Sequence, residues 1–276
     1  MKPPKIVILT DLSALSLVAI KYAIRLGGPL HADFTLLNVV RIEGPSKANL
    51  KLKSIEKMLM AAAEEEGKAI MKELRAEIKG EYTLRFMAVH GHTVSRAIMS
   101  YTEKNPTNMV VMGSRGASAI KKARMGGTAV SVIDDCEGPV LAIPELAQYK
   151  NLAKIVYASD LKNVQQELDI LIEFARIYGS HIHMIHVVPA LDKKTEISSH
   201  AVEELIRKTK YDKLDFRIII DENIPAAIDQ FIKDTKSDLL TTFTHHLSIF
   251  EKLFARSVTR TLAYLGTIPL LALKRK

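Results

Sequence analysis

The chain has 276 residues, of which 47% are hydrophobic and 25% charged, a balance typical of a globular protein with an ample core. No apolar run approaches the roughly 18 residues of a membrane span, and Met1 to Pro4 lead straight into a strand pattern, so we expect a cytoplasmic protein without a signal peptide. The net charge of +8 is spread over predicted helix faces, which disfavours nucleic acid as a partner, and the single Cys136 excludes an intrachain disulfide.

Short runs rich in Val, Ile and Leu alternate with helical patterns along the whole chain. The first half has five predicted strands, Lys5–Thr10, Phe34–Val40, Thr83–Val89, Asn108–Met112 and Val140–Ile143. The second half has five more, Lys154–Ser159, His181–Val188, Asp215–Ile220, Leu239–Thr242 and Leu270–Lys274. This alternation predicts βαβ units, and therefore α/β architecture with parallel sheets covered on both faces.

An internal repeat divides the chain. The run Lys5–Leu12 returns as Lys154–Leu161, and both copies end in a hydroxyl residue, an Asp and a Leu. Leu36–Val40 likewise returns as Met184–Val188, in the same order along the chain. We therefore predict two tandem doubly wound five-stranded domains of order 3-2-1-4-5, covering residues 1–147 and 151–276. The second copy is shorter where the first has the charged segment Lys51–Lys79. The stretch Gly44–Lys79 predicts a loop and a long solvated helix, or alternatively a partner surface.

Glycines follow the fourth strand of the first copy. Gly113 and Gly116 come directly after it, and Gly126, Gly127 and Thr128 open the next helical pattern. Glycine lets backbone N–H groups approach an anion, and the first turn of a helix adds a partial positive charge. The spacing is neither the Walker pattern nor the GxGxxG of dinucleotide folds. It predicts a phosphate cradle of another kind, and Lys121, Lys122 and Arg124 either screen a triphosphate there or lie on a solvated loop.

At these residues the chain resembles the universal stress protein superfamily in its tandem form. The resemblance is carried by Thr10–Ser13, Leu37–Val40, the motif Gly113-x2-Gly-x9-Gly126 and Pro139–Ile143, and it covers nearly the whole chain. It implies an adenine nucleotide alpha hydrolase-like fold and a cytosolic regulator that responds to ATP, AMP or ADP, with Mg²⁺ accompanying ATP. It also implies that domains pair through their last strands, here Val140–Ile143 and Leu270–Lys274, while association of two chains into a homodimer stays open.

The resemblance also implies where the nucleotide lies. Leu9, Thr10 and Asp11 fall beside adenine and ribose, and Val39 falls against the base. The polyphosphate falls to the cradle residues, namely Gly113, Gly116, Gly126, Gly127 and Thr128. ATP-binding members carry Ser or Thr directly after the last glycine, whereas here that position is Gly127 and the hydroxyl is displaced to Thr128. This departure predicts the loss of one hydrogen bond, roughly 0.5 to 1.5 kcal/mol, and so weaker binding.

The second copy lacks the cradle. In an ungapped comparison Phe243 replaces Gly113, and His246, Arg256 and Ser257 replace the other three glycines. A Phe where backbone must approach phosphate is a steric obstacle, so we predict that the second domain binds no ATP in this way. The segment Ser248–Arg256, with Phe250, Leu253 and Phe254, either fills the vacated space, forms a partner surface, or is an ordinary partly buried amphipathic segment.

The histidines give no catalytic or metal site by pattern. His90-Gly91-His92 resembles the HxGH signature of nucleotidyl transferases but lacks one residue and follows the third strand. His181 and His183 share one face of a strand while His186 points to the other, so the three are interpreted as strand packing. No nucleophile and base pair stands out either.

Three functional hypotheses follow from the sequence. The first is a stress-response regulator that binds an adenine nucleotide in its first domain and uses its second domain as a structural or interaction partner. The second is a slow ATPase or phosphotransferase with the same cradle, and the third is an interaction module that has lost its nucleotide.

Overall fold

The structure is a computed structural model that describes residues 2–41, 49–115, 125–190, 193–244 and 268–275. The chain forms two compact units, Met1–Tyr149 and Lys150–Lys276, each with five strands. Among the described residues, no helix is both long enough and apolar enough to cross a bilayer. We call the two units unit 1 and unit 2.

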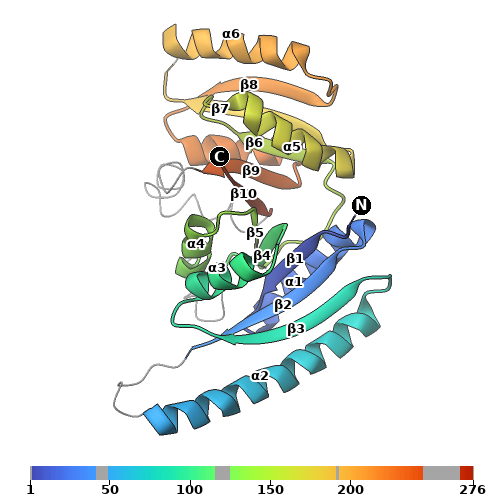
Figure 1. Ribbon diagram of the computed structural model, residues 1–276. Helices are drawn as coiled ribbons and strands as arrows, with labels where there is room; N and C mark the ends of the chain where they lie inside the picture. Colours follow the sequence, from blue (N-terminus) through green and yellow to red (C-terminus); the bar gives the residue numbers. More distant parts are fainter. Residues whose placement is uncertain (1, 42–48, 116–124, 191–192, 245–267, 276) are drawn as a thin grey trace. The chain divides into compact units, whose positions relative to one another are not determined.

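Unit 1 contains five parallel strands in the order β3-β2-β1-β4-β5 (Figure 1). Its strands are β1 (Lys5–Leu9), β2 (Asp33–Val40), β3 (Thr83–His90), β4 (Met109–Gly113) and β5 (Val140–Ile143). Its helices are α1 (Ala14–Gly27), the short 3-10 helix η1 (Gly28–Leu30), α2 (Asn49–Glu77), α3 (Val94–Lys104) and α4 (Gly127–Asp135). The predicted strands and their order are therefore confirmed.

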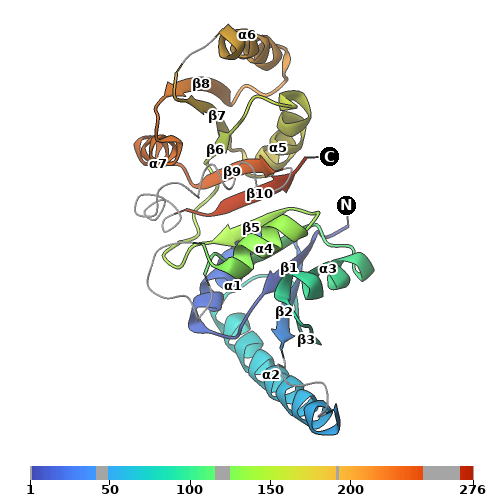
Figure 2. The ribbon, with the colours of Figure 1, turned by 90° about the vertical axis from the view of Figure 1, so that its left-hand side faces the viewer.

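The core of unit 1 lies on both faces of this sheet. In β1 every residue after Lys5 is buried, because α1 covers one face and α3 lies on the other side (Figure 2). A strand covered on both faces needs apolar side chains at every position, which is why Ile6–Leu9 is a continuous apolar run. Helix α1 begins where Ser13 accepts a hydrogen bond from Ser16 N, so its start is fixed directly after the loop that follows β1.

Unit 2 repeats this arrangement, with five parallel strands in the order β10-β9-β6-β7-β8. Its strands are β6 (Lys154–Ala158), β7 (His181–Val188), β8 (Leu214–Ile220), β9 (Leu239–Thr244) and β10 (Leu270–Lys274). Its helices are α5 (Val164–Tyr178), α6 (Lys193–Lys208) and α7 (Ile224–Thr235), and Figure 2 shows α5 and α7 on opposite faces of the sheet. Numbered within the unit, the order is again 3-2-1-4-5.

The strand register shows which residues of the two units correspond to each other. Val7 pairs with Val110 in unit 1, and Val156, the counterpart of Val7, pairs with Leu240 in unit 2. Counting along β4 and β9 from these pairs brings Gly113 and Phe243 to the same place in their sheets. The ungapped sequence comparison of these two strands therefore agrees with the hydrogen-bonded register.

Candidate functional site

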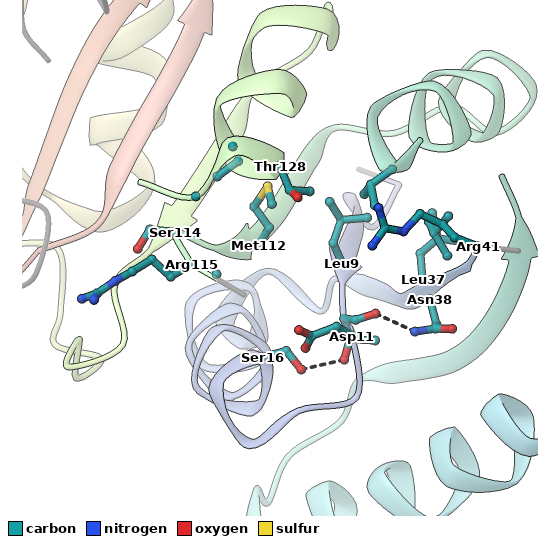
Figure 3. Close-up of a pocket in the computed structure, with 17 residues that line it drawn as sticks. Leu9, Asp11, Ser16, Leu37, Asn38, Arg41, Met112, Ser114, Arg115 and Thr128 are labelled. Carbon is teal, nitrogen blue, oxygen red and sulfur yellow. Dashed lines mark hydrogen bonds between the residues drawn. The ribbon is translucent and has the colours of Figure 1, made fainter. Parts of the chain in front are cut away.

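A cavity of about 470 Å³ lies in unit 1 at the carboxyl ends of β1, β2 and β4 (Figure 3). In a parallel α/β sheet this is the end at which ligands bind, next to the point where the winding reverses. The residues around it are Leu9, Thr10, Asp11, Ser16, Leu37, Asn38, Val39, Arg41, Val94, Met112, Gly113, Ser114, Arg115, Gly126, Gly127, Thr128 and Ala129.

Every predicted site residue that the structure describes lines this one cavity. Gly116 and the three basic residues Lys121, Lys122 and Arg124 lie outside the described residues, as do His246 and Ser248–Ser257 of the second copy. Sequence reasoning missed several further lining residues, namely Ser16, Leu37, Asn38, Arg41, Val94, Met112, Ser114, Arg115 and Ala129. Asn38 had a usable signal, since it is a polar residue inside an apolar strand that the repeat pairs with His186.

The loop after β1 has a fixed shape. Leu12 has a left-handed backbone (φ 64°), and its N–H donates to Thr10 Oγ1 at 2.9 Å. Asp11 Oδ1 accepts from Ser13 N at 3.1 Å, which closes a short turn. These local bonds hold the exposed Asp11 carboxylate at the cavity, directly beyond the buried strand.

Two further side chains, Asn38 and Ser16, brace this loop with hydrogen bonds. Asn38 Nδ2 on β2 donates to the Thr10 carbonyl at 2.9 Å, and Thr10 Oγ1 is 2.8 Å from Ser16 Oγ on α1 (Figure 3). Asn38, Thr10 and Ser16 are all buried, so these bonds satisfy polar groups that water cannot reach. The loop is therefore tied to a strand on one side and to a helix on the other.

The opposite wall of the cavity presents backbone donors. Gly126 N donates to Ser114 O at 2.8 Å, which closes the loop after β4 onto the start of α4. The first helical acceptor of α4, Gly126 O, is bonded by Val130 N, so the N–H groups of Gly127, Thr128 and Ala129 have no acceptor inside the helix. The first turn of α4 carries no acidic side chain, and this wall is therefore suited to an anion.

Side chains at Gly113 and Gly127 would have different consequences. A Cβ at Gly113 would stand 3.0 Å from the carbonyl oxygen of Arg115, whereas a Cβ at Gly127 would meet nothing within 4 Å. A side chain at Gly113 would thus require the backbone at Arg115 to shift by a few tenths of an ångström. Gly127 is free to vary as far as the described neighbours are concerned, and it is the better position for testing the site.

Two arginines border the cavity. Arg41 extends from the end of β2 toward Leu9, while Arg115 extends away from Leu9 and Asp11 (Figure 3). The cavity thus combines an apolar wall at Leu9 and Val39, a carboxylate, and a helix end flanked by positive charge. Such a combination fits a ligand that has a flat apolar part, hydroxyl groups and an anionic tail, and the volume lies in the roughly 300–1,000 Å³ range of small-molecule sites.

Unit 2 repeats the loop that carries Asp11 in unit 1. Leu161 is left-handed (φ 61°) and donates to Ser159 Oγ at 3.0 Å, and Lys162 N donates to Asp160 Oδ1 at 3.1 Å. His186 replaces Asn38, and its Nδ1 lies 2.8 Å from the Ser159 carbonyl. His186 thus braces the loop after β6, which explains why it points to the opposite strand face from His181 and His183.

The carboxylate of this loop has a different environment in unit 2. Arg275, which follows β10, forms hydrogen-bonded ion pairs with Asp160 and with Glu167 of α5, and Tyr157 donates to Glu167. The side chains of Arg275 and Glu167 are only 4% and 2% exposed. The carboxylate of unit 2 that corresponds to Asp11 is thus neutralised within its own unit. We call Tyr157, Asp160, Glu167 and Arg275 the arginine cluster.

Ionisation in the arginine cluster follows from burial and from this cation. Burial raises the pKa of Glu167, although Tyr157 and Arg275 act in the opposite direction. Burial alone would raise the pKa of Asp160 as well, but the hydrogen bonds and charge of Arg275 outweigh it and lower that pKa. Burial also raises the pKa of the Tyr157 phenol far above its usual value, so Tyr157 stays a hydrogen-bond donor.

Comparison with known proteins places this geometry in a family. Residues 3–144 match the sequence profile of the universal stress protein family. A universal stress protein of Methanocaldococcus jannaschii is 26% identical over 140 residues, which span 50% of this chain and 81% of that protein. A crystal structure of a universal stress protein from Archaeoglobus fulgidus covers 100% of both chains with a TM-score of 0.68 at 18% identity. A protein of unknown function from Pseudomonas aeruginosa covers 99% of this chain and 93% of its own, with a TM-score of 0.62 at 14% identity. At these identities the two solved structures show the fold alone.

Proposed function

Because this chain belongs to the universal stress protein family, we propose that unit 1 binds an adenine nucleotide, ATP foremost, and that the protein is a cytoplasmic stress-response regulator. The observation that supports this most is the single cavity that collects a carboxylate, an apolar wall and a helix N-terminus. Unit 2 is proposed to be a degenerate universal stress protein-like domain that binds no nucleotide.

The nucleoside part would lie against β1 and β2. Leu9 and Val39 supply apolar contact for the base, and the Asp11 carboxylate accepts from a ribose hydroxyl or from the adenine amine. Asp11 is suited to this because its position is fixed by the turn to Ser13 before any ligand arrives. A preorganised acceptor loses little conformational entropy on binding.

The phosphates would lie at the start of α4. Three N–H groups, those of Gly127, Thr128 and Ala129, are without helical acceptors there, and the helix dipole favours negative charge. The Thr128 hydroxyl adds a donor, one residue beyond the place where the family pattern has it. Arg41 is positioned to add positive charge for an adenylate tail.

Unit 2 would serve as a structural or interaction partner. Its last strand, β10, and the last strand of unit 1, β5, each stand at the end of their unit's strand order. Pairing of Val140–Ile143 with Leu270–Lys274 would satisfy two strand edges that are otherwise open to association with other chains. This is the proposed reason for the duplication, and association of two whole chains is a separate question for the oligomeric state.

The test begins with the ligand itself. Mass spectrometry of small molecules released from the purified full-length chain should find an adenylate, and calorimetric titration with ATP and Mg²⁺ should show one site per chain. AMP and ADP titrated in parallel identify the adenylate that is bound most tightly. Absence of binding at millimolar concentrations of all three would favour the alternative of an interaction module that has lost its nucleotide.

The placement of the phosphates is tested by Gly127→Asp. A Cβ at this position meets nothing within 4 Å, and an acidic residue in the first helical turn stabilises the helix, so the fold should be as stable as before or more stable. Repulsion between the new carboxylate and the phosphates should weaken ATP binding at least about a hundredfold, equivalent to roughly 2.7 kcal/mol.

Gly138→Asp is the matched control for this charge. Gly138 lies in the turn before β5, away from the cavity, and a Cβ there also meets nothing within 4 Å. It adds the same charge to unit 1 and should leave ATP affinity within about twofold. Equal ATP affinities of the two variants would show that the phosphates lie elsewhere. Gly113→Val is a poorer choice, because its Cβ would already press on Arg115 O in the ligand-free fold.

A slow ATPase is the second candidate. Its supporting observation is the same helix end, since backbone donors that hold phosphates also stabilise the charge that develops during phosphoryl transfer. Incubation of the bound ATP for hours followed by chromatography separates the two hypotheses. Recovery of intact ATP supports the regulator, and stoichiometric conversion to ADP that is lost in Gly127→Asp supports the enzyme.

A further inference from the structure

Two histidines and an aspartate converge at the start of β7 and β8 in unit 2. His181 and His183 lie on the same face of β7, and Asp215 on β8 is the direct register partner of His183. His181 Nε2 and His183 Nδ1 are each 2.7 Å from the same oxygen, Asp215 Oδ2. This cluster lies at the amino ends of the strands, the opposite edge of the sheet from the arginine cluster.

The sequence pattern alone indicated strand packing for these histidines, because it considered only His181, His183 and His186, which do not share one strand face. The structure keeps His186 on the other face, bonded to Ser159 O, and brings Asp215 in as the third group instead. All three potential ligand atoms lie within 4.8 Å of one another. The side chains are partly open, at 37% for His181, 12% for His183 and 33% for Asp215, so an ion and water molecules can reach them.

We propose that His181 Nε2, His183 Nδ1 and the Asp215 carboxylate bind a divalent transition-metal ion of the Zn²⁺ type, with water completing the coordination shell. Nitrogen and oxygen ligands at about 2.0–2.2 Å around a tetrahedral ion stand roughly 3.3 Å apart, so each histidine nitrogen needs to move about 0.6 Å away from Asp215 Oδ2, from which it is now 2.7 Å. Side-chain torsions of three partly exposed groups provide this small movement without a change in the strands.

The donor atoms of the cluster select the kind of ion. Two imidazole nitrogens and one carboxylate are a poor set for a hard ion such as Ca²⁺ or Mg²⁺, which is bound by oxygen ligands. Arg217 Nε is 3.7 Å from Asp215 Oδ1, and its charge weakens the purely electrostatic attraction of any cation. An ion that binds imidazole strongly is favoured instead, and this describes Zn²⁺, Co²⁺, Ni²⁺ and Cu²⁺.

Packing holds His183 in place for this role. The ring of Phe231 on α7 packs edge-on against the His183 ring, with 5.9 Å between centroids. Asp215 Oδ1 is buried and has no hydrogen-bond partner among the described residues, which leaves it available as a second carboxylate ligand atom.

The bound ion would join β7 to β8. β8 is the last strand in the order of unit 2 and β7 is its neighbour, and a ligand that binds only the folded form raises stability by mass action. The expected consequence is a unit 2 whose stability depends on transition metal, independently of the nucleotide in unit 1. Failure of the nucleotide hypothesis therefore leaves this inference untouched, and the reverse also holds.

The experiment uses the untagged full-length chain after chelator treatment and dialysis. Zn²⁺ titrated into the chain should bind with a stoichiometry of one, and Co²⁺ in its place should give visible d–d absorption, which reports ligands directly. In His183→Gln the affinity should fall at least about tenfold and the metal-dependent rise in melting temperature should disappear. Asp215→Asn gives a second, independent variant that retains the size of the side chain and removes its charge.

His200→Gln is the matched control, because His200 lies on α6 with 81% of its side chain exposed and outside the cluster. It removes one histidine from the same unit and should bind Zn²⁺ like the unchanged chain. Circular dichroism of each variant confirms that unit 2 is folded. The proposal is overturned if folded His183→Gln and Asp215→Asn bind Zn²⁺ as tightly as the control, or if the unchanged chain binds no ion.

Discussion

The two units have the same loop after their first strand and use it in opposite ways. In unit 1, Thr10, Asp11 and Leu12 form a braced turn whose carboxylate lines a cavity of about 470 Å³. In unit 2 the counterparts form the same turn, but the Asp160 carboxylate is bonded by the chain's own Arg275. The backbone and its local hydrogen bonds are therefore repeated, while the group that faces the carboxylate differs.

The two units also differ at the end of their fourth strand. Gly113 and Phe243 occupy the same register position, and Phe243 is 1% exposed and packs edge-on against Tyr157 with centroids 5.6 Å apart. A glycine that lines the cavity in unit 1 thus corresponds to a packed aromatic side chain in unit 2. The arginine cluster neutralises a carboxylate that is partly buried.

The largest expected effect on this comparison comes from Arg275→Met. Removing the cation leaves Glu167 buried and Asp160 partly buried without it, and such breaking of a buried pair costs about 3–5 kcal/mol. Denaturant unfolding at pH 7 measures the loss. Lys162→Met is the control, since Lys162 is 75% exposed and pairs with the same Asp160 at 3.9 Å, which makes it worth about 0–1 kcal/mol.

The same variant has a defined pH dependence. The pKa of Asp160 is lower in the folded protein, so Asp160 contributes stability above its unfolded pKa of about 3.9, and this is lost as pH falls through the folded pKa. The pKa of Glu167 is raised in the folded protein, so the stability that Glu167 contributes is present at low pH and is lost as pH rises through the folded pKa. Without Arg275 both carboxylates favour protonation. The penalty of Arg275→Met should therefore be full at pH 7 and smaller near pH 4, and a penalty that grows in acid would contradict the arginine cluster.

A smaller effect is expected from the brace that both loops share. Asn38→Ala leaves the buried Thr10 carbonyl without its donor, and His186→Ala does the same to Ser159 in unit 2. Each should cost about 1–3 kcal/mol. Hydrogen exchange followed by mass spectrometry should show faster exchange confined to residues 5–12 for the first variant and 154–161 for the second.

Asn38→Asp distinguishes the hydrogen bond from simple filling of space. It keeps the size of the side chain but turns the donor toward Thr10 O into an acceptor. We expect it to destabilise unit 1 at least as much as Asn38→Ala. If it is instead as stable as the unchanged chain, the Asn38 side chain only fills space, and the loop does not depend on the hydrogen bond that Asn38 Nδ2 donates to Thr10 O.

The strands and their order could be predicted because strands covered on both faces are continuous apolar runs, as Ile6–Leu9 and Val140–Ile143 show. The repeat then supplied the second sheet. Strand ends were less certain, since β9 extends to Thr244 where Leu239–Thr242 was predicted, with all six residues buried. The sequence of β9 continues from threonine to Phe243 and Thr244 without a turn residue, so it does not indicate where the strand ends.

Site residues that lie within a motif could be predicted, and those that come from elsewhere in the chain could not. Asp11, Gly126 and Thr128 follow strands or open a helix, so their position in the sheet follows from the fold. Arg275 lies 115 residues from Asp160, and Asp215 lies 32 residues from His183. No local pattern predicts such contacts, because they depend on the register of neighbouring strands.

The smallest expected effect sharpens the comparison at the intact site. Gly127→Ser places a hydroxyl directly after Gly126, where the universal stress protein pattern has one, and its Cβ meets nothing within 4 Å. One added hydrogen bond to phosphate should tighten ATP binding by roughly 0.5–1.5 kcal/mol, which is about twofold to twelvefold in a calorimetric titration. Gly127→Ala adds the same Cβ without the hydroxyl and should leave the affinity unchanged, while gaining the stability of a better helix former. The hydroxyl is responsible if only the Ser variant binds more tightly. Equal gains in both variants would instead mean that reduced backbone freedom at the start of α4 limits binding, and that Thr128 already fills the place of the missing donor.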